Sequence, residues 1–297
     1  MSTVEWFDQP QPFLDAAEAW LAREPVVNTV IASYTHRLAR GWSEHTVPEG
    51  QPCWWAVVRD ESDQVVGAAM GTAPFRPYPP YLLPMPAAAA VALAQEVSQR
   101  GITIEGVNGA LPAIETFAAE TVRLNGGRWE VVERTRLFDL PRLVEPAPVP
   151  GRLRSATADD LDLCVAWFGE FHRDVDLVAG RDPGPHGSET ADPRDVLERV
   201  TAGVVYLWEV DGDIVHLTAA NPPSYGVARV GPVYTPSEHR GRGYASAAVA
   251  EVSRDILAAG HRACLFTDQA NPTSNHVYEA LGYRPLVDMA NVRVTPG

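Results

Sequence analysis

One layout of predicted elements occurs twice along this 297-residue chain, and it limits the possible folds more than composition does. In each half, a β-hairpin is followed by a helix that ends at a glycine, and then by an apolar strand. The second hairpin turns at Asp211-Gly212, a dipeptide typical of two-residue hairpin loops. The helix and its glycine fall at 87–101 in the first half and 244–260 in the second. The repeat predicts two copies of one α/β unit.

A proline-rich segment, residues 140–151, separates the two copies. Prolines at positions 141, 146, 148 and 150 fix φ and remove amide donors, so we expect an extended linker. We therefore expect two domains, residues 1–145 and 146–297, which agrees with the usual size of a domain.

Composition narrows the classes of partner. The formal net charge of -14 and the pI near 5.0 argue against a nucleic-acid or anionic-membrane partner, because such affinity comes mainly from Lys and Arg. Cys53, Cys164 and Cys264 lack the paired spacing of zinc sites, so we expect buried thiols and no metal. The acidic N-terminus does not resemble a secretory signal, and no stretch is long enough for a membrane span. These features predict a cytoplasmic protein.

A glycine-rich loop distinguishes the second copy from the first. The stretch from hairpin to glycine covers residues 64–101 in the first half and 213–260 in the second, so the second is ten residues longer. The second interval contains Arg240-Gly-Arg-Gly-Tyr-Ala-Ser246, which follows a β-rich run and leads directly into the helix. The first turn of a helix has four free amide donors and a partial positive charge. This segment therefore predicts an anion site, and only the second copy has it.

Two other anion-binding loops do not fit these residues. A Walker A loop ends in Gly-Lys-Ser/Thr, and no lysine occurs between Gly243 and Ser246. A dinucleotide fingerprint needs glycine or alanine where Ser246 stands.

A second motif lies downstream, at 271–283. Asn271 is a good helix N-cap, Pro272 suits the first helical position, and Gly282 suits the residue that ends a helix. A helix of two to three turns that contains Tyr278 is expected.

Together the two motifs resemble the GNAT superfamily of N-acetyltransferases. Its Arg/Gln-x-x-Gly-x-Gly/Ala signature matches Arg240, Gly243 and Ala245, and its Asn-to-Tyr helix matches Asn271 and Tyr278. The resemblance covers roughly residues 152–294. It implies two tandem GNAT-like domains of the α/β (α+β) class, each a mixed, mostly antiparallel twisted sheet flanked by helices, of which the first is degenerate.

The resemblance also implies acetyl-CoA as co-substrate, no metal, and a small-molecule or peptide amine as acceptor. In such enzymes the loop amides hold the CoA diphosphate, and the preceding strand pairs with the pantetheine arm, where the two central strands splay apart. The implied cofactor-binding residues are Val233, Tyr234, Thr235, Arg240, Gly241, Arg242, Gly243, Tyr244, Ala245, Ser246 and Asn271.

Acetyl transfer requires a proton for the departing thiolate, and the resemblance implies Tyr278 as the catalytic acid. A tyrosine of pKa about 10 is protonated at neutral pH and can supply that proton. No general base is singled out among the five candidates, Glu209, His216, Glu238, His239 and Asp268. The segment 180–193 is a candidate acceptor-side loop. A module that binds acyl-CoA without turnover is the alternative to an enzyme.

Overall fold

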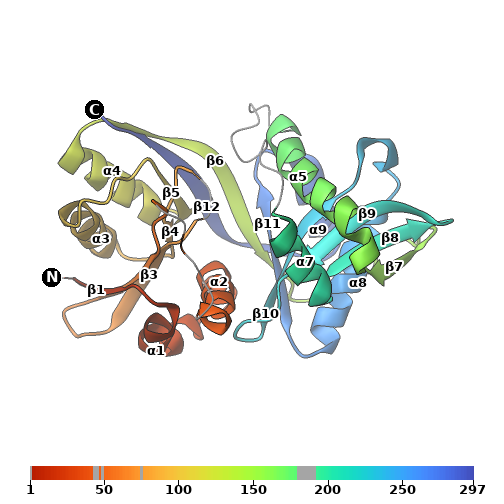
Figure 1. Ribbon diagram of the computed structural model, residues 1–297, viewed down its shortest axis with the longest axis horizontal. Coiled ribbons are helices and arrows are strands. Elements are labelled where there is room, and N and C mark those ends of the chain that lie inside the picture. The colour runs from red at the N-terminus through yellow and green to blue at the C-terminus, as the bar shows by residue number, and fades with distance from the viewer. Residues whose placement is uncertain (1, 43–46, 48–49, 74–75, 179–191) are drawn as a thin grey trace. The chain divides into compact units, whose positions relative to one another are not determined.

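The computed structural model describes residues 2–42, 47, 50–73, 76–178 and 192–297. The chain divides into two units, which are coloured by residue number in Figure 1. Unit 1 comprises Met1–Leu137 with Leu286–Gly297, and unit 2 comprises Phe138–Pro285. None of the helices in the described part of the chain has both the length and the hydropathy that a bilayer span needs.

The first copy of the repeat has the order βααβββαβαβ. Its elements are β1 (Thr3–Phe7), α1 (Pro10–Leu21), α2 (Thr29–Arg40), β2 (Trp54–Arg59), β3 (Val65–Gly71), β4 (Tyr81–Leu82), α3 (Ala87–Gln99), β5 (Gly106–Ala110), α4 (Ala113–Asn125) and β6 (Arg128–Asp139).

Within the described residues, the second copy has the same order of strands and α-helices, together with the short 3-10 turns η2 and η3. Its elements are β7 (Arg152–Ser155), η2 (Ala158–Asp160), α5 (Leu161–Val178), α7 (Pro193–Thr201), β8 (Val205–Val210), β9 (Asp213–Ala220), β10 (Val227–Tyr234), η3 (Ser237–His239), α8 (Tyr244–Ala258), β11 (Arg262–Asp268), α9 (Pro272–Ala280) and β12 (Arg284–Thr295). The predicted tandem layout is therefore confirmed.

Strand pairing is mostly antiparallel in both units, as the predicted fold class requires. The strand order is β1-β2-β3-β4-β5-β12-β6 in unit 1 and β11-β10-β9-β8-β7 in unit 2. The parallel pairs are β4 with β5 and β10 with β11, which hold equivalent places in the two copies. In each copy the helix between these strands, α3 or α8, makes the crossover that parallel strands need.

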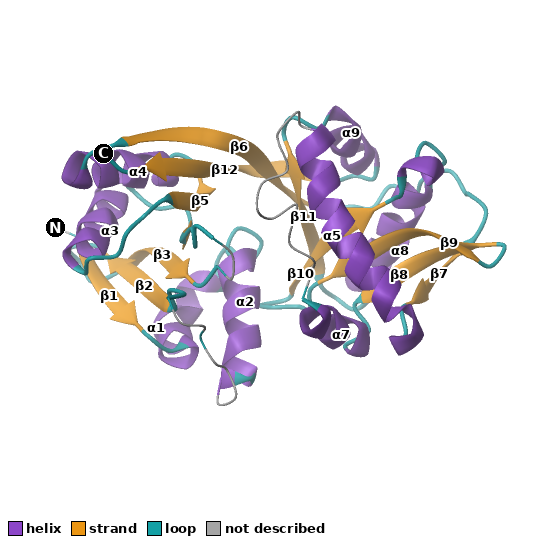
Figure 2. Cartoon of the chain, turned by 45° about the horizontal axis from the view of Figure 1, so that its top comes forward, coloured by secondary structure: helices purple, strands orange, loops and turns teal. Residues whose placement is uncertain are grey.

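Helices pack on both faces of each unit's strands (Figure 2). Alternation along β8 shows why: Val205 and Leu207 point into the cluster formed with α5 and α7, whereas Trp208 packs with Tyr244 at the start of α8. Unit 1 repeats this arrangement on β2, where Trp54 packs with α3 and α4 and Trp55 contacts Phe13 of α1.

The two units do not meet at the boundary expected between residues 145 and 146, and the C-terminal strand is the main reason. β12 pairs antiparallel with β5, from Met289 opposite Ala110 onward, so Leu286–Gly297 belongs to unit 1. The end of β6 contributes in turn to unit 2, where the amide of Leu140 donates to the carbonyl of Ala263 at 2.9 Å. The last strand of the second copy thus belongs mostly to unit 1, whereas only the last two residues of β6, Phe138 and Asp139, belong to unit 2.

The three cysteines are free thiols. Cys164 and Cys264 are buried as expected, whereas Cys53, just before β2, is only partly buried.

Candidate functional site

The site lies in unit 2, where the parallel strands β10 and β11 separate. Their pairing runs from Val227 opposite Arg262 to Arg229 opposite Cys264, and within the described residues it stops there although both strands continue. On its other side, β10 pairs with β9 through an irregularity between Val230 and Val233. The C-terminal part of β10 therefore has backbone groups that no strand pairs on the β11 side.

The loop after β10 presents free amides. Gly241 and Gly243 have φ of 74° and 83°, values that favour glycine, and Gly243 is the N-cap of α8. The first backbone hydrogen bond of the helix runs from the amide of Ala247 to the carbonyl of Gly243. Among the described residues, the amides from Gly241 to Ser246 have no acceptor. These amides, together with the positive end of the helix dipole, form a site suited to an anion.

A cavity of about 350 Å³ joins this loop to the separated strands and to α9. Every residue predicted from the sequence as part of the site lines it, namely Val233, Tyr234, Thr235, Arg240, Gly241, Arg242, Gly243, Tyr244, Ala245, Ser246, Asn271 and Tyr278. The two motifs, whose central residues are more than 30 positions apart in the chain, thus meet in one cavity.

Further lining residues were missed by the sequence analysis. Ser274 lies one turn before Tyr278 on α9, where helical spacing from that tyrosine indicates it, and Val277 lies on the same helix. Phe171 and Asp174 come from α5, some 60 residues before the loop, and no local pattern connects them to it.

The side chain of Arg240 is already engaged within the protein. Its Nε donates to the carbonyl of Thr235 at 2.9 Å, and its Nη2 forms an ion pair with Asp174. Nη2 of Arg242 donates to the carbonyl of Glu238 at 3.2 Å. Arg240 therefore holds the end of β10, the loop and α5 together.

The helix that carries Tyr278 begins and ends where capping rules place it. The side chain of Asn271 accepts a hydrogen bond from the amide of Ser274 at 3.1 Å, with Pro272 at the first helical position. Gly282, with φ of 99°, follows the helix. The predicted caps are confirmed.

Tyr278 is 8% exposed and lines the cavity. Its ring packs edge-on against Tyr283 at 6.1 Å between centroids. Burial raises the pKa of the Tyr278 phenol above its usual value, because the phenolate would lose its solvation. No hydrogen-bond partner of its hydroxyl is found among the described residues. Tyr278 is thus a protonated, free donor at the wall of the cavity.

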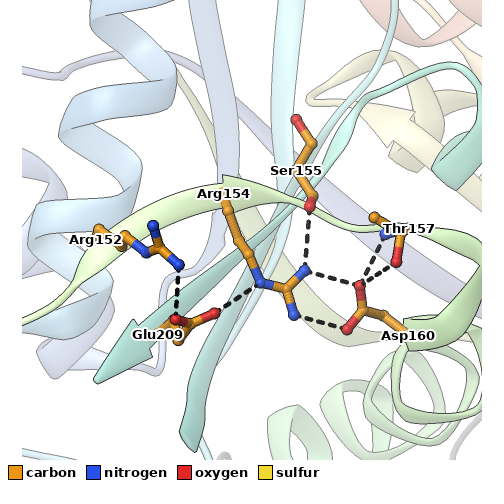
Figure 3. Close-up of polar contacts among 6 residues, drawn as sticks. All are labelled: Arg152, Arg154, Ser155, Thr157, Asp160 and Glu209. Carbon is orange, nitrogen blue, oxygen red and sulfur yellow. Dashed lines mark hydrogen bonds and ion pairs between the residues drawn. The ribbon is translucent and has the colours of Figure 1, made fainter. Parts of the chain in front are cut away.

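The candidate general bases differ in what they contact. Figure 3 shows the Glu209 carboxylate between Arg152 and Arg154, at 2.9 and 3.0 Å, and these bonds lower its pKa. Arg154 also forms a bidentate pair with Asp160, at 2.7 and 2.8 Å. Glu209 therefore belongs to a structural ion network around β7 and does not line the cavity.

The other candidates give no base beside Tyr278. His216 is fully buried, and Glu238 lies on a neighbouring polar cavity. His239 lines the main cavity, but it precedes the glycine loop and lies at that end. An Asp268 oxygen accepts from the amide of Ala270 at 2.8 Å. The candidate acceptor-side loop at 180–193 falls almost entirely outside the described residues.

Comparison with known proteins agrees with this geometry. The model of the FR47-like protein family matches residues 210–294, which include both motifs. No curated protein matches the chain in sequence.

Solved structures match the whole chain at low identity. A GCN5-related N-acetyltransferase from Sphaerobacter thermophilus is 16% identical, with a TM-score of 0.60 over 100% of this chain and 96% of that one. A tandem GNAT protein from the clavulanic acid biosynthesis pathway, without acetyl-CoA, is 14% identical, with a TM-score of 0.56 over 99% and 100%. A Drosophila protein is 12% identical, with a TM-score of 0.65 over 100% and 99%. The likeness to these structures shows that the chain has the fold of GNAT acetyltransferases in two tandem units, and the segment similar to the FR47-like family lies mostly in the second.

Proposed function

We propose that unit 2 transfers an acetyl group from acetyl-CoA to a primary amine. The observation that carries the proposal is one cavity that joins the unpaired amides at the start of α8 to the free hydroxyl of Tyr278. A diphosphate at one end and a thioester at the other would use both features.

The loop would hold the diphosphate of CoA. Hydrogen bonds to a charged group contribute roughly 1.5 to 3 kcal/mol each, so several amides from Gly241 to Ser246 together provide substantial affinity. The side chain of Arg240 is bonded to Thr235 and Asp174, so its proposed role is to order the loop whose amides bind the diphosphate.

The unpaired edge of β10 would hold the pantetheine arm. Val233 and Tyr234 lie past the point where β11 leaves, so the backbone groups of this segment that do not pair with β9 are available to an extended ligand. The amides of the pantetheine arm would then pair with β10 as an additional strand of the sheet does.

Tyr278 would donate its proton to the sulfur as the thiolate departs. The amine nitrogen forms a bond to the acetyl carbonyl carbon, the carbon–sulfur bond breaks, and the phenol proton passes to sulfur. Burial keeps the phenol protonated before that moment. The proton that the nitrogen loses on becoming an amide then passes through solvent to the phenolate, which restores Tyr278. The attacking amine must itself be neutral, and we assign its deprotonation to solvent, since no described side chain beside Tyr278 serves as base.

Thiol release from acetyl-CoA, followed with a thiol reagent across a panel of primary amines, tests this proposal. Turnover with at least one amine, dependent on Tyr278, is expected. Tight CoA binding with no turnover on any amine would instead favour a non-catalytic acyl-CoA module.

A further inference from the structure

A fully buried histidine lies directly behind the cavity. His216 is on β9 and has no exposed surface. Its Nδ1 lies 2.7 Å from the Thr235 hydroxyl, and its Nε2 lies 2.6 Å from the Thr218 hydroxyl. A neutral imidazole has one donor and one acceptor nitrogen, so the two threonines satisfy both.

The ring is neutral in the folded protein. Burial lowers the pKa of His216 to about 3, and both hydrogen-bonding partners are uncharged hydroxyls. A neutral buried histidine without a carboxylate partner is poorly suited to act as a general base. Its two short hydrogen bonds instead make it a fixed link between side chains.

Thr235 is the link to the cavity. It lines the cavity, follows the last residue of β10, and its carbonyl accepts from Nε of Arg240. Arg240 in turn is paired with Asp174 on α5. A continuous series of contacts therefore runs from His216 through Thr235 to the first residue of the glycine loop.

The network fixes the place where the strand becomes the loop. The hydroxyl of Thr235 is hydrogen-bonded to His216 on β9, and its carbonyl accepts from Arg240 in the loop. A threonine without the histidine would be free to rotate about χ1, and the turn would lose one of its two anchors. Rigid groups bind a ligand with less loss of entropy than mobile ones.

We propose that His216 is a positioning residue for acyl-CoA binding, which acts through the Thr235 hydroxyl to hold the β10 turn and the glycine loop in their binding geometry. This inference rests on the proposed function of unit 2. It assigns His216 no contact with the ligand and no proton transfer.

Calorimetric titration of the full chain with CoA tests the inference. His216→Phe keeps a buried ring without the hydrogen bonds, and Thr235→Val removes the hydroxyl but keeps the carbonyl that Arg240 uses. Each variant is expected to weaken CoA binding about fivefold, the effect of one net hydrogen bond. The double variant is expected to bind CoA as tightly as the more affected of the two single variants, because both substitutions remove the same hydrogen bond.

Thr218→Val is the matched control. It removes the other hydroxyl that is hydrogen-bonded to His216, lies at a fully buried position, and does not line the cavity. It is expected to lower the Tm while its Kd for CoA stays within about twofold of wild type.

The outcomes separate this inference from the proposed function. Failure of wild type to bind CoA would overturn the proposed function. Binding by wild type with an unchanged Kd in Thr235→Val would overturn the inference, and this partly exposed position keeps the test open even if His216→Phe does not fold. Additive losses in the double variant, or an equal loss in Thr218→Val, would also overturn it.

Discussion

The parallel strand pairs of the two units are built from equivalent elements, yet one pair is closed and the other open. In unit 1, β4 and β5 remain paired to the last residue of β4, where Leu82 lies opposite Gly109. In unit 2, β10 and β11 separate after Arg229 and Cys264. At this strand pair, the same fold therefore supports close strand contact in one copy and a cavity in the other.

The connections to the next helix differ in the same way. Only residues 83–86 separate β4 from α3, and Leu83 and Met85 are buried. Between β10 and α8 lie η3 and the glycine loop, with its amides free. The connection in the second copy, residues 235–243, is thus five residues longer than residues 83–86, and it contains the glycine loop proposed to bind the anion.

The largest effect is expected from removing the proposed acid. Tyr278→Phe should lower kcat about 100-fold, since a positioned general acid contributes about that much or more, while the Kd for CoA is unchanged. Steady-state thiol release and calorimetry measure the two. Tyr283→Phe is the control, because this tyrosine packs against Tyr278 but bonds Ser253 at 2.8 Å. A full rate in Tyr278→Phe would remove that residue from the mechanism.

The closed strand pair of unit 1 gives the next prediction. Gly109 has φ of 137°, and a Cβ there would lie 2.0 Å from the Leu82 carbonyl oxygen. Gly109→Ala should therefore cost at least about 2 kcal/mol of unfolding free energy, measured by denaturant titration. Gly101→Ala, at a positive φ with open space around it, should cost less. Equal costs would mean that the strands of unit 1 are not in close contact.

The open pair of unit 2 is tested at the N-cap of α8. Gly243→Ala places a Cβ at φ of 83° and 2.9 Å from Val149 Cγ1, so the loop must shift. We expect CoA binding to weaken about tenfold, the equivalent of about 1.4 kcal/mol. Gly260→Ala is the control: Gly260 has a similar φ, 80°, just after the other end of the same helix, and an added Cβ there would contact no atom within 4 Å. If both variants lose the same affinity, the loss reflects helix stability and not the loop.

The last prediction concerns stability at acid pH. The pKa of His216 is lowered to about 3 in the folded protein, against about 6.5 in an unfolded chain. Between those values the unfolded chain binds a proton that the folded protein does not. The free energy of unfolding is therefore unaffected by this group above about pH 6.5 and decreases as the pH falls below that value. The Tm of wild type should fall more steeply from pH 6 to pH 4 than that of His216→Phe. Parallel curves would contradict the buried neutral imidazole.

Local signals in the sequence were enough to predict much of the lining of the cavity. The repeated hairpin, helix and glycine predicted the tandem fold, and glycines 241 and 243 predicted a loop with free amides. Asn271 and Gly282 predicted the bounds of the helix that carries Tyr278. Each of these signals depends on the backbone preferences of residues a few positions apart.

Non-local contacts could not be predicted in this way. The pattern of β12 indicates a strand, but it does not say that the strand pairs with β5 of the other copy. Asp174 reaches Arg240 only because α5 packs beside β10. His216 was visible as a strand histidine, whereas its bond to Thr235, 19 residues later, depends on the strand register.

The stoichiometry and location of CoA binding test the central claim most directly. Calorimetric titration of the intact chain should give one CoA per chain, and Gly243→Ala should weaken that binding while Gly109→Ala leaves it in place. Two equivalent sites per chain, or a single site that Gly243→Ala does not affect, would contradict the account.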